Sequence, residues 1–150
     1  MILGMTGHRT IINYNATYLA FQNILNELKP EYTICGVAVG ADQLFAVICI
    51  RLGIPFIAAV PFVGQECKWP EHVQKQYKKI LTNAKEVIIV SDGDYSNQKF
   101  HIRNEWIVDH SDKLLAYYDG SVRSGTGNCY NYAKKINKEI IRINPKNLND

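Results

Sequence analysis

Short apolar segments alternate with longer amphipathic segments along this chain, and this alternation restricts the fold more than any single motif does. The apolar runs are rich in β-branched and aromatic residues, which favour extended strands. They predict strands at residues 2–6, 33–38, 54–60, 86–91, 113–118 and 139–143. Between them, apolar residues recur at helical spacing and predict helices at residues 16–28, 41–52, 71–83, 100–110 and 128–136. The order of elements is therefore strand, helix, strand, helix throughout.

The predicted strands are apolar on both faces, so both faces of their sheet must be covered by other elements. Strands of this kind that are joined by helices form parallel sheets between two helical layers. We therefore expect an α/β fold in a single domain, residues 1–150: a Rossmann-like, doubly wound, mostly parallel sheet with helices on both faces. At 150 residues, about two thirds of the unfolded chain's surface can be buried in one core.

Composition argues against several other classes of protein. The apolar stretches are interrupted before they reach a membrane-spanning length, and the start of the chain lacks a basic leader, so we expect a cytoplasmic protein without a membrane partner. The four cysteines show no C-x-x-C spacing, which favours buried free thiols over a disulfide or zinc site. We expect no metal and no cofactor. A formal charge of +3 without a dense basic run disfavours a nucleic-acid partner.

The loop after the fifth predicted strand, residues 119–128, is the strongest candidate site. It combines glycines and hydroxyls with the start of a helix, where free backbone N–H groups and the positive end of the helix dipole suit a phosphate. The ligand-binding residues expected here are Asp119, Ser124, Gly125, Thr126, Gly127 and Asn128. The alternative is a glycine-rich turn capped by Asn128 that needs no ligand.

In a doubly wound sheet the other loops at the carboxyl ends of the strands share the same edge. After the first strand, Gly7, His8 and Arg9 offer a tight turn and a cation for phosphate, although without the other loops a surface turn with solvated side chains is the preferred interpretation.

After the second strand, Gly36 and Gly40 let backbone approach a ligand, and Asp42 either accepts from ribose hydroxyls or caps the helix. Packing of the two glycines against the helix is the competing interpretation.

Two aromatic residues, Phe62 and Trp69, lie in the loop after the third strand. Large aromatic side chains are unusual in a loop that is exposed to solvent. Either ring can stack on a base, or the pair covers the sheet edge or a subunit interface.

Arg103 and Asn104 lie early in the fourth predicted helix. We call the edge of the sheet at the carboxyl ends of the strands the rim. We expect Arg103 near this rim, where it binds an anion or pairs with Glu105 or Asp109.

Together these loops resemble the SLOG superfamily, the Rossmann-like group that includes the DNA-processing protein DprA (Smf) and the cytokinin-activating LOG enzymes, and most closely its YpsA-like branch. The matching segments span nearly the whole domain in the same order; they are residues 6–9, 36–42, Pro61 and Phe62 with Gln65, Glu66 and Trp69, residues 103–112, and Gly125 and Thr126 followed by Tyr132 and Ala133.

The resemblance implies a nucleotide-type ligand at the rim, with its phosphate at Gly125 and Thr126, and a homo-oligomer. It also implies that Arg103 matches the arginine that LOG enzymes use to cleave a base from a nucleotide. The LOG glutamate, three residues after the threonine, is replaced here by Cys129, and Ser124 replaces the first glycine of the usual pair. A thiol cannot stabilise an oxocarbenium-like sugar as a carboxylate does.

Three functions follow as hypotheses. The first is a non-enzymatic sensor or sequestering protein for a nucleotide, such as an NAD-derived or cyclic signalling nucleotide. The second is a LOG-like hydrolase of an N-glycosidic bond, with Glu66, Asp42 and Arg103 as catalytic candidates and Glu105 as another source of the carboxylate. The third, disfavoured by the modest charge, is a DprA-like accessory that binds single-stranded DNA. The short chain is also compatible with a phage origin.

Overall fold

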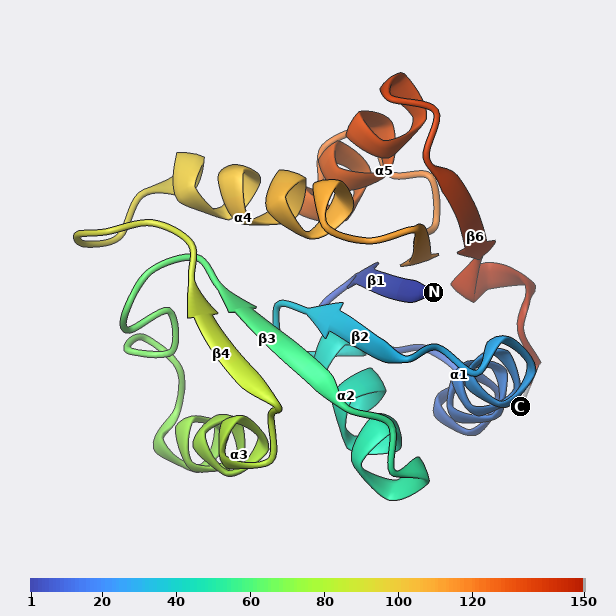
Figure 1. Ribbon diagram of the computed structural model, residues 1–150, viewed down its shortest axis with the longest axis horizontal. Coiled ribbons are helices and arrows are strands. Elements are labelled where there is room, and N and C mark those ends of the chain that lie inside the picture. The colour runs from blue at the N-terminus through green and yellow to red at the C-terminus, as the bar shows by residue number, and fades with distance from the viewer. Residues whose placement is uncertain (150) are drawn as a thin grey trace.

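The computed structural model describes residues 1–149, which form one parallel sheet between two layers of helices (Figure 1). The six strands are β1 (Ile2–Gly7), β2 (Tyr32–Cys35), β3 (Phe56–Val60), β4 (Glu86–Ile89), β5 (Lys113–Tyr117) and β6 (Glu139–Ile143). Their order across the sheet is β4-β3-β2-β1-β5-β6, and every neighbouring pair is parallel. The expected Rossmann-like α/β fold is therefore confirmed.

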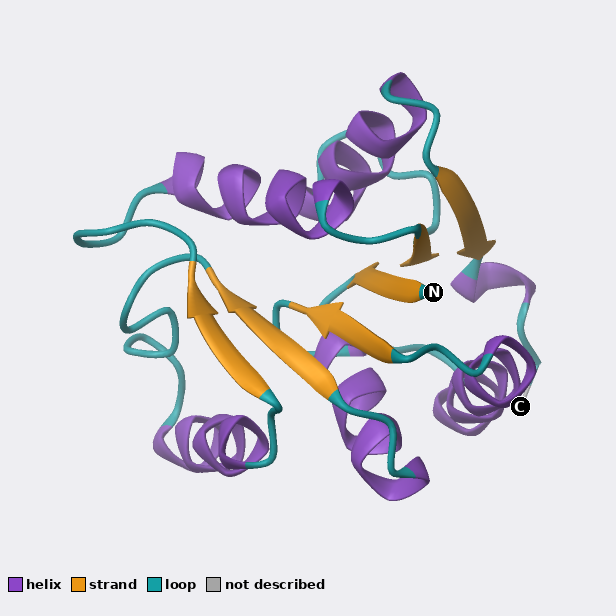
Figure 2. Cartoon of the chain, in the orientation of Figure 1, coloured by secondary structure: helices purple, strands orange, loops and turns teal. Residues whose placement is uncertain are grey.

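Helices cover both faces of the sheet (Figure 2). The helices are α1 (Tyr14–Leu28), α2 (Ala41–Leu52), α3 (Glu71–Thr82), α4 (Asn97–Asp109) and α5 (Gly125–Lys135), followed by a short 3-10 turn, η1 (Pro145–Asn147). The first three lie on one face, and α4 and α5 lie on the other (Figure 1). In the described part of the chain, no helix is long and apolar enough to cross a membrane.

Two apolar clusters form the core, one on each side of the sheet. The larger cluster packs α1, α2 and α3 against the sheet and includes Phe21, Phe45 and Tyr77. The smaller cluster packs α4 and α5 against the other face through residues such as Ile107 and Ala133. Adjacent strand residues alternate between the two clusters, as the side-chain period of two requires. The apolar pattern on both strand faces therefore has its expected physical cause.

The four cysteines are free thiols. Cys35, Cys49 and Cys129 are buried, as expected, whereas Cys67 is exposed in the loop after β3.

Several predicted element ends were wrong, and the largest errors lie beside the rim. The second strand ends at Cys35, not at residue 38, because Val37 adopts a left-handed conformation (φ 53) that turns the chain out of the sheet. The last helix begins at Gly125, not at residue 128, because Ser124 caps it: its side chain accepts from the Gly127 N–H at 2.9 Å. The alternative of an Asn128 cap was therefore wrong.

Two other helices also begin earlier than predicted, since α1 starts at Tyr14 and α4 at Asn97. The remaining strand and helix ends differ by no more than two residues, while α2 and β6 match their predicted bounds.

Gly40 joins β2 to α2 at a point where no side chain fits. Its φ is 98°, and a Cβ atom added there would collide with the backbone carbonyl of Arg9. The neighbouring Ala41 N–H donates to the His8 carbonyl at 3.0 Å. The loop after β1 is thus stacked directly on the start of α2.

We predict that Gly40→Ala lowers the free energy of unfolding by about 3 kcal/mol or more, because both a backbone conformation with positive φ and a collision with the Arg9 backbone oppose an alanine there. Gly53→Ala is the matched control, since Gly53 also has a positive φ (72°) but an added Cβ meets nothing within 4 Å. The control should lose only about 1 kcal/mol. Equal losses in urea denaturation would contradict this explanation of Gly40.

Candidate functional site

A cleft of about 980 Å³ opens beside the carboxyl ends of the strands. It lies where the strand order reverses: the chain builds outward from β1 to β4 and then returns to add β5 and β6 on the other side of β1. Doubly wound sheets bind ligands at this kind of switch point. We call it the rim cleft; it is lined by residues 6–10, Ile12, Ala38, Asp42, Gln65, residues 67–69, Tyr95, Asn97, Phe100, Arg103, Asn104, Asp119, Ser121, residues 123–126, Pro145 and Lys146.

Most of the residues expected from the sequence meet in the rim cleft, although they come from five separate segments. Those that line it are Gly7, His8, Arg9, Asp42, Trp69, Arg103, Asn104, Asp119, Ser124, Gly125 and Thr126. Their contact with a ligand stays a prediction.

Three expected residues serve the packing of the protein instead of lining the rim cleft. A Cβ atom at Gly36 would collide with the guanidinium of Arg103, so this glycine makes room for a side chain and not for a ligand. Gly40 makes room for the Arg9 carbonyl. Gly127 faces the Ser121 carbonyl, which would lie 2.9 Å from an added Cβ. These contacts favour the packing interpretation of the glycines after β2, and their contact with a ligand stays a prediction.

Phe62, Glu66 and Asn128 also lie outside the lining of the rim cleft. Phe62 is buried and packs edge-on against the rings of Tyr95 and Phe100, so it cannot stack on a base. Trp69 does line the rim cleft while its ring packs against Tyr77. Of the two aromatic residues, only Trp69 is placed to meet a ligand.

One end of the rim cleft offers hydrogen-bond donors. The backbone N–H groups of Gly125 and Thr126 open α5, and neither has an acceptor within residues 1–149, since Ser124 satisfies only Gly127. An added Cβ at Gly125 meets nothing within 4 Å, so this backbone is open to a ligand. Arg123 is exposed in the loop that leads into this helix. This end can hold an anion.

The opposite end offers acceptors. Asp42 is buried in the first turn of α2, where its Oδ2 accepts from the Ala38 N–H at 3.4 Å and its Oδ1 has no hydrogen-bond partner among the described residues. Burial raises the pKa of Asp42 to about 6, against the attraction of Arg103 and the nearby N–H groups of Ala38 and Gly36. Asp42 is not the helix cap, because Gly40 occupies that position.

Gln65 lines the rim cleft but was not among the expected ligand-binding residues. Its Nε2 donates to the Gly36 carbonyl at 3.0 Å and to the Tyr77 hydroxyl at 2.9 Å, whereas its Oε1 has no partner within residues 1–149. A glutamine in a loop carries no sequence signal for such burial. Its position beside Glu66 and Trp69 in the resemblance was the one available indication.

Arg103 forms the floor of the rim cleft and not its rim. The side chain is 5% exposed and donates from Nη1 to the carbonyls of Ala59 (3.0 Å) and Gly36 (3.3 Å), and from Nε to Asn104 Oδ1 (2.9 Å). Burial lowers its pKa, and the carboxylate of Asp42 opposes that shift. Arg103 therefore does lie at this edge of the sheet, but at the buried floor of the rim cleft, and its contact with an anion stays a prediction.

The alternative, an ion pair of Arg103 with Glu105 or Asp109, was wrong, because those carboxylates lie on the exposed side of α4 while Arg103 is buried against the sheet. Asp109 instead accepts from the Tyr132 hydroxyl at 2.6 Å.

His8 and Asp119 close the rim cleft between the loops after β1 and β5. The Nε2 atom of His8 lies 3.0 Å from Asp119 Oδ1 and 3.0 Å from the Asp119 N atom. The hydroxyl and backbone N–H of Ser121, and then His8, lower the pKa of Asp119 to about 2. Asp119 is therefore ionised, and its carboxylate is occupied by its own loop.

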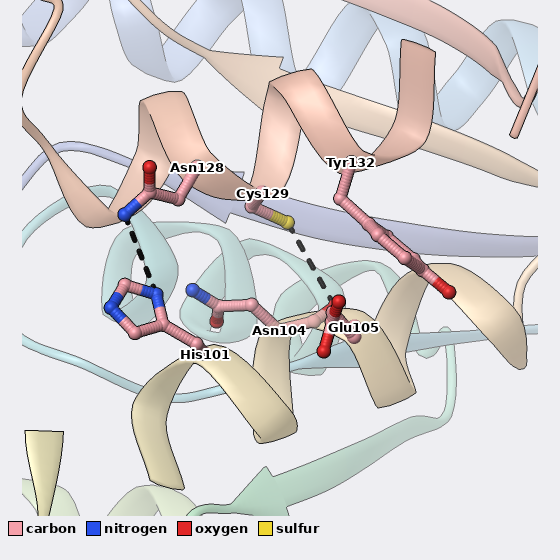
Figure 3. Close-up of a pocket in the computed structure, with 6 residues that line it drawn as sticks. All are labelled: His101, Asn104, Glu105, Asn128, Cys129 and Tyr132. Atoms are coloured by element: carbon pink, nitrogen blue, oxygen red, sulfur yellow. Dashed lines mark hydrogen bonds between the residues drawn. The ribbon is translucent and has the colours of Figure 1, made fainter. Parts of the chain in front are cut away.

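A second, smaller groove of about 300 Å³ lies between α4 and α5 (Figure 3). His101 and Asn128 face each other across it at 3.4 Å, and the thiol of Cys129 points toward the Asn104 carbonyl at 3.9 Å (Figure 3). Cys129 is buried, which raises its pKa to about 12. The residue at the LOG glutamate position is thus a protonated thiol between two helices, outside the rim cleft.

The protein is a Rossmann-like domain with a cleft at the point where its strand order reverses. Comparison with known families narrows the class: the model of the YspA SLOG family matches residues 12–148. The chain belongs to that family, as its loops had predicted.

Similar proteins include the SPbeta prophage-derived protein YoqJ of Bacillus subtilis, which is 37% identical over 141 residues that cover 81% of each chain. Among solved structures, DNA processing protein A of Helicobacter pylori is similar with a TM-score of 0.72 and 18% identity, over 95% of this chain and 64% of that one. The molybdenum cofactor binding protein of Rippkaea orientalis is similar with a TM-score of 0.65 and 16% identity, over 95% of this chain and 76% of that one.

We predict that Arg103→Ala lowers the free energy of unfolding by about 3 kcal/mol, because it leaves the Asp42 carboxylate buried without its nearby cation and two carbonyls without a donor. Arg123→Ala is the control: this arginine is exposed, and its loss should change stability by less than about 0.5 kcal/mol. Urea unfolding curves of both variants measure the difference. A stable Arg103→Ala protein would show that the guanidinium does not support the floor.

Proposed function

We propose that the rim cleft binds a nucleotide or a nucleotide-derived ligand, and that the protein is a sensor or a sequestering protein for it. The observation that carries this proposal is the pair of unpaired N–H groups at Gly125 and Thr126, which open α5 beside a cleft at the switch point and have no acceptor within residues 1–149. Such N–H groups and the helix dipole bind phosphate without any further catalytic group. An NAD-derived or cyclic signalling nucleotide fits a cleft of this size and polarity.

The other residues that line the cleft suit a ligand that carries both an anionic group and an aromatic ring. Arg9, Lys68, Arg123 and Lys146 surround the opening with exposed cations, which favour an anion. Trp69 supplies an aromatic surface for a base. A structural neighbour is described as a molybdenum cofactor binding protein, which supports a role of this fold in binding a small molecule.

Binding accounts for the lining residues better than hydrolysis does. Glu66 lies outside the lining, and Asp119 is held by Ser121 and His8. Asp42 is the remaining carboxylate that lines the rim cleft within the described residues. Cys129 stands where LOG enzymes use a glutamate, and it faces α4. A hydrolase would have to rely on Asp42 alone.

From the family resemblance we also propose a cytoplasmic homo-oligomer. The relation to a prophage-derived protein supports a phage origin.

The test is thermal unfolding in the presence of millimolar ADP-ribose, NAD, AMP, ADP or cyclic nucleotides. A ligand that binds the folded state alone raises the melting temperature; at one hundred times its Kd it adds about 2.7 kcal/mol of stability. Gly125→Val should weaken the binding about tenfold in terms of Kd, because the branched side chain blocks approach to the N–H groups.

The same variant should keep the melting temperature of the ligand-free protein, since a Cβ at residue 125 meets no neighbour within 4 Å. No shift with any of these nucleotides would refute the proposal. An equal shift in the variant would place the phosphate elsewhere.

Binding of single-stranded DNA is the second candidate, favoured by the structural likeness to DNA processing protein A, whose Helicobacter pylori structure is described by its single-stranded DNA binding mode. In this case a labelled oligonucleotide should be retained in a gel shift at physiological salt, and its affinity should fall steeply as salt rises, because each neutralised phosphate releases counterions. Arg9→Ala and Arg123→Ala should each reduce that salt dependence. Free oligonucleotide throughout the titration would remove this candidate.

A further inference from the structure

Two buried acceptor atoms in the rim cleft lack donors. Asp42 Oδ1 and Gln65 Oε1 have no hydrogen-bond partner within residues 1–149, and the two residues are 6% exposed each. Buried polar atoms are almost always paired, because an unmade hydrogen bond in the interior is costly. Both residues line the same cleft, so a ligand that enters it can supply the missing donors.

The acceptors cannot easily turn away to find other partners. Gln65 is anchored through its Nε2 to Gly36 and Tyr77, and Asp42 is tied through Oδ2 to Ala38. The loop before Asp42 is held in a strained shape: Val37 has a φ of 53°, and its carbonyl accepts from Gln43 Nε2 at 3.2 Å. A β-branched residue in this conformation persists only where the surroundings enforce it. The acceptors are therefore preorganised.

The acceptors and the N–H groups of α5 stand at different places along the sheet edge. Asp42 follows β2, whereas Gly125 follows β5, and β1 lies between these two strands. Two strand spacings put the ends of β2 and β5 roughly 10 Å apart. One ligand that reaches both ends must carry an anionic group at one end and hydrogen-bond donors at the other.

The two ends of the cleft suit different parts of a nucleotide. An ionised phosphate has acceptors and no donors, so it suits Gly125 and Thr126 and is repelled by the carboxylate of Asp42. The hydroxyls of a ribose are neutral and can each donate a hydrogen bond, so they suit the two unpartnered acceptors in this cleft. Arg103, beneath Gly36, already compensates the charge of Asp42 and leaves its Oδ1 free to accept.

We propose that the rim cleft selects ribonucleotides: free ribose hydroxyls donate to Asp42 Oδ1 and Gln65 Oε1 while the phosphate binds at the start of α5. This inference rests on the proposed nucleotide-binding function and adds the class of sugar to it. A deoxyribose leaves at least one of the buried acceptors unpaired, and a phosphorylated ribose hydroxyl brings a second anion to Asp42. The same arrangement disfavours DNA in this cleft.

Isothermal titration of the wild-type protein with matched pairs, ADP against 2′-deoxy-ADP and 3′-deoxy-ADP, and GDP against 2′-deoxy-GDP, tests the inference. For the base that binds, the ribonucleotide should bind at least about tenfold more tightly than either deoxy form. Equal affinities for ribose and deoxyribose forms would overturn the inference and leave nucleotide binding standing. No heat with any nucleotide would overturn the proposed function itself.

Asp42→Asn separates sugar recognition from general binding. The Ala38 N–H requires an acceptor on its side of the residue, so the amide oxygen of the substituted side chain should face Ala38 and its NH₂ group should face the rim cleft. The NH₂ group can still donate to the oxygen of a ribose hydroxyl, but the stronger bond from that hydroxyl to a carboxylate is lost, so the preference for ribose over deoxyribose should fall to about threefold or less. Asp109→Asn, at an exposed carboxylate on α4, should keep the wild-type ratio.

If Asp42→Asn kept the wild-type preference for ribose over deoxyribose, the proposed role of Asp42 would be overturned. If that variant unfolds, Gln65→Glu provides the same test, since it keeps the side-chain shape but places a charged oxygen at the Nε2 position. The ribose-to-deoxyribose ratio of Gln65→Glu should also change from that of the wild type. An unchanged ratio in Gln65→Glu would show that Gln65 does not contact the sugar and would overturn the inference as stated.

Discussion

The buried guanidinium of Arg103 is the interaction on which the site depends. It reaches from α4 beneath the sheet edge to the carbonyls of Gly36 and Ala59, at the ends of β2 and β3, and it sits near the carboxylate of Asp42. Gly36 must be a glycine because the guanidinium occupies the place of its side chain. A cation shared by these backbone carbonyls fixes the loop after β2, which in turn positions the acceptors of the rim cleft.

Around this floor, the rim cleft separates two kinds of polar group. Backbone donors gather where α5 begins, and buried acceptors gather where α2 begins. Neither kind needs to move for a ligand to bind, because the donors belong to a helix end and the acceptors are held by their other atoms. A static arrangement with complementary ends is suited to a ligand that carries an anionic group and hydrogen-bond donors at separate places.

The sequence predicted the fold well because hydrophobic periodicity reflects how each strand and helix is buried. Residues 41–52 show this most clearly, since glycine at both ends and an apolar stripe between them leave little choice of helix bounds. The site was predicted less completely. Gly36 and Gly40 had the small side chains that a ligand contact needs, yet close packing needs the same, and only the fold reveals that Arg103 and the Arg9 carbonyl fill those spaces.

Arg103 was expected near the rim, but its burial could not be predicted, because burial of a cation depends on carbonyls contributed by distant strands and the weak apolar stripe of α4 does not indicate it. Gln65 carried no signal for the same reason: its partners, Gly36 and Tyr77, belong to other elements. Hydrogen bonds between distant elements cannot be predicted from the local spacing of apolar residues.

The most direct measurement of the central claim is a nuclear magnetic resonance titration of ¹⁵N-labelled protein with ADP-ribose, followed through its backbone amide signals. If the rim cleft holds the phosphate at the start of α5, the amides of Gly125 and Thr126 should shift most, together with those of residues 38–43. Shifts confined to the groove between α4 and α5, around His101 and Tyr132, or no shifts at all, would contradict it.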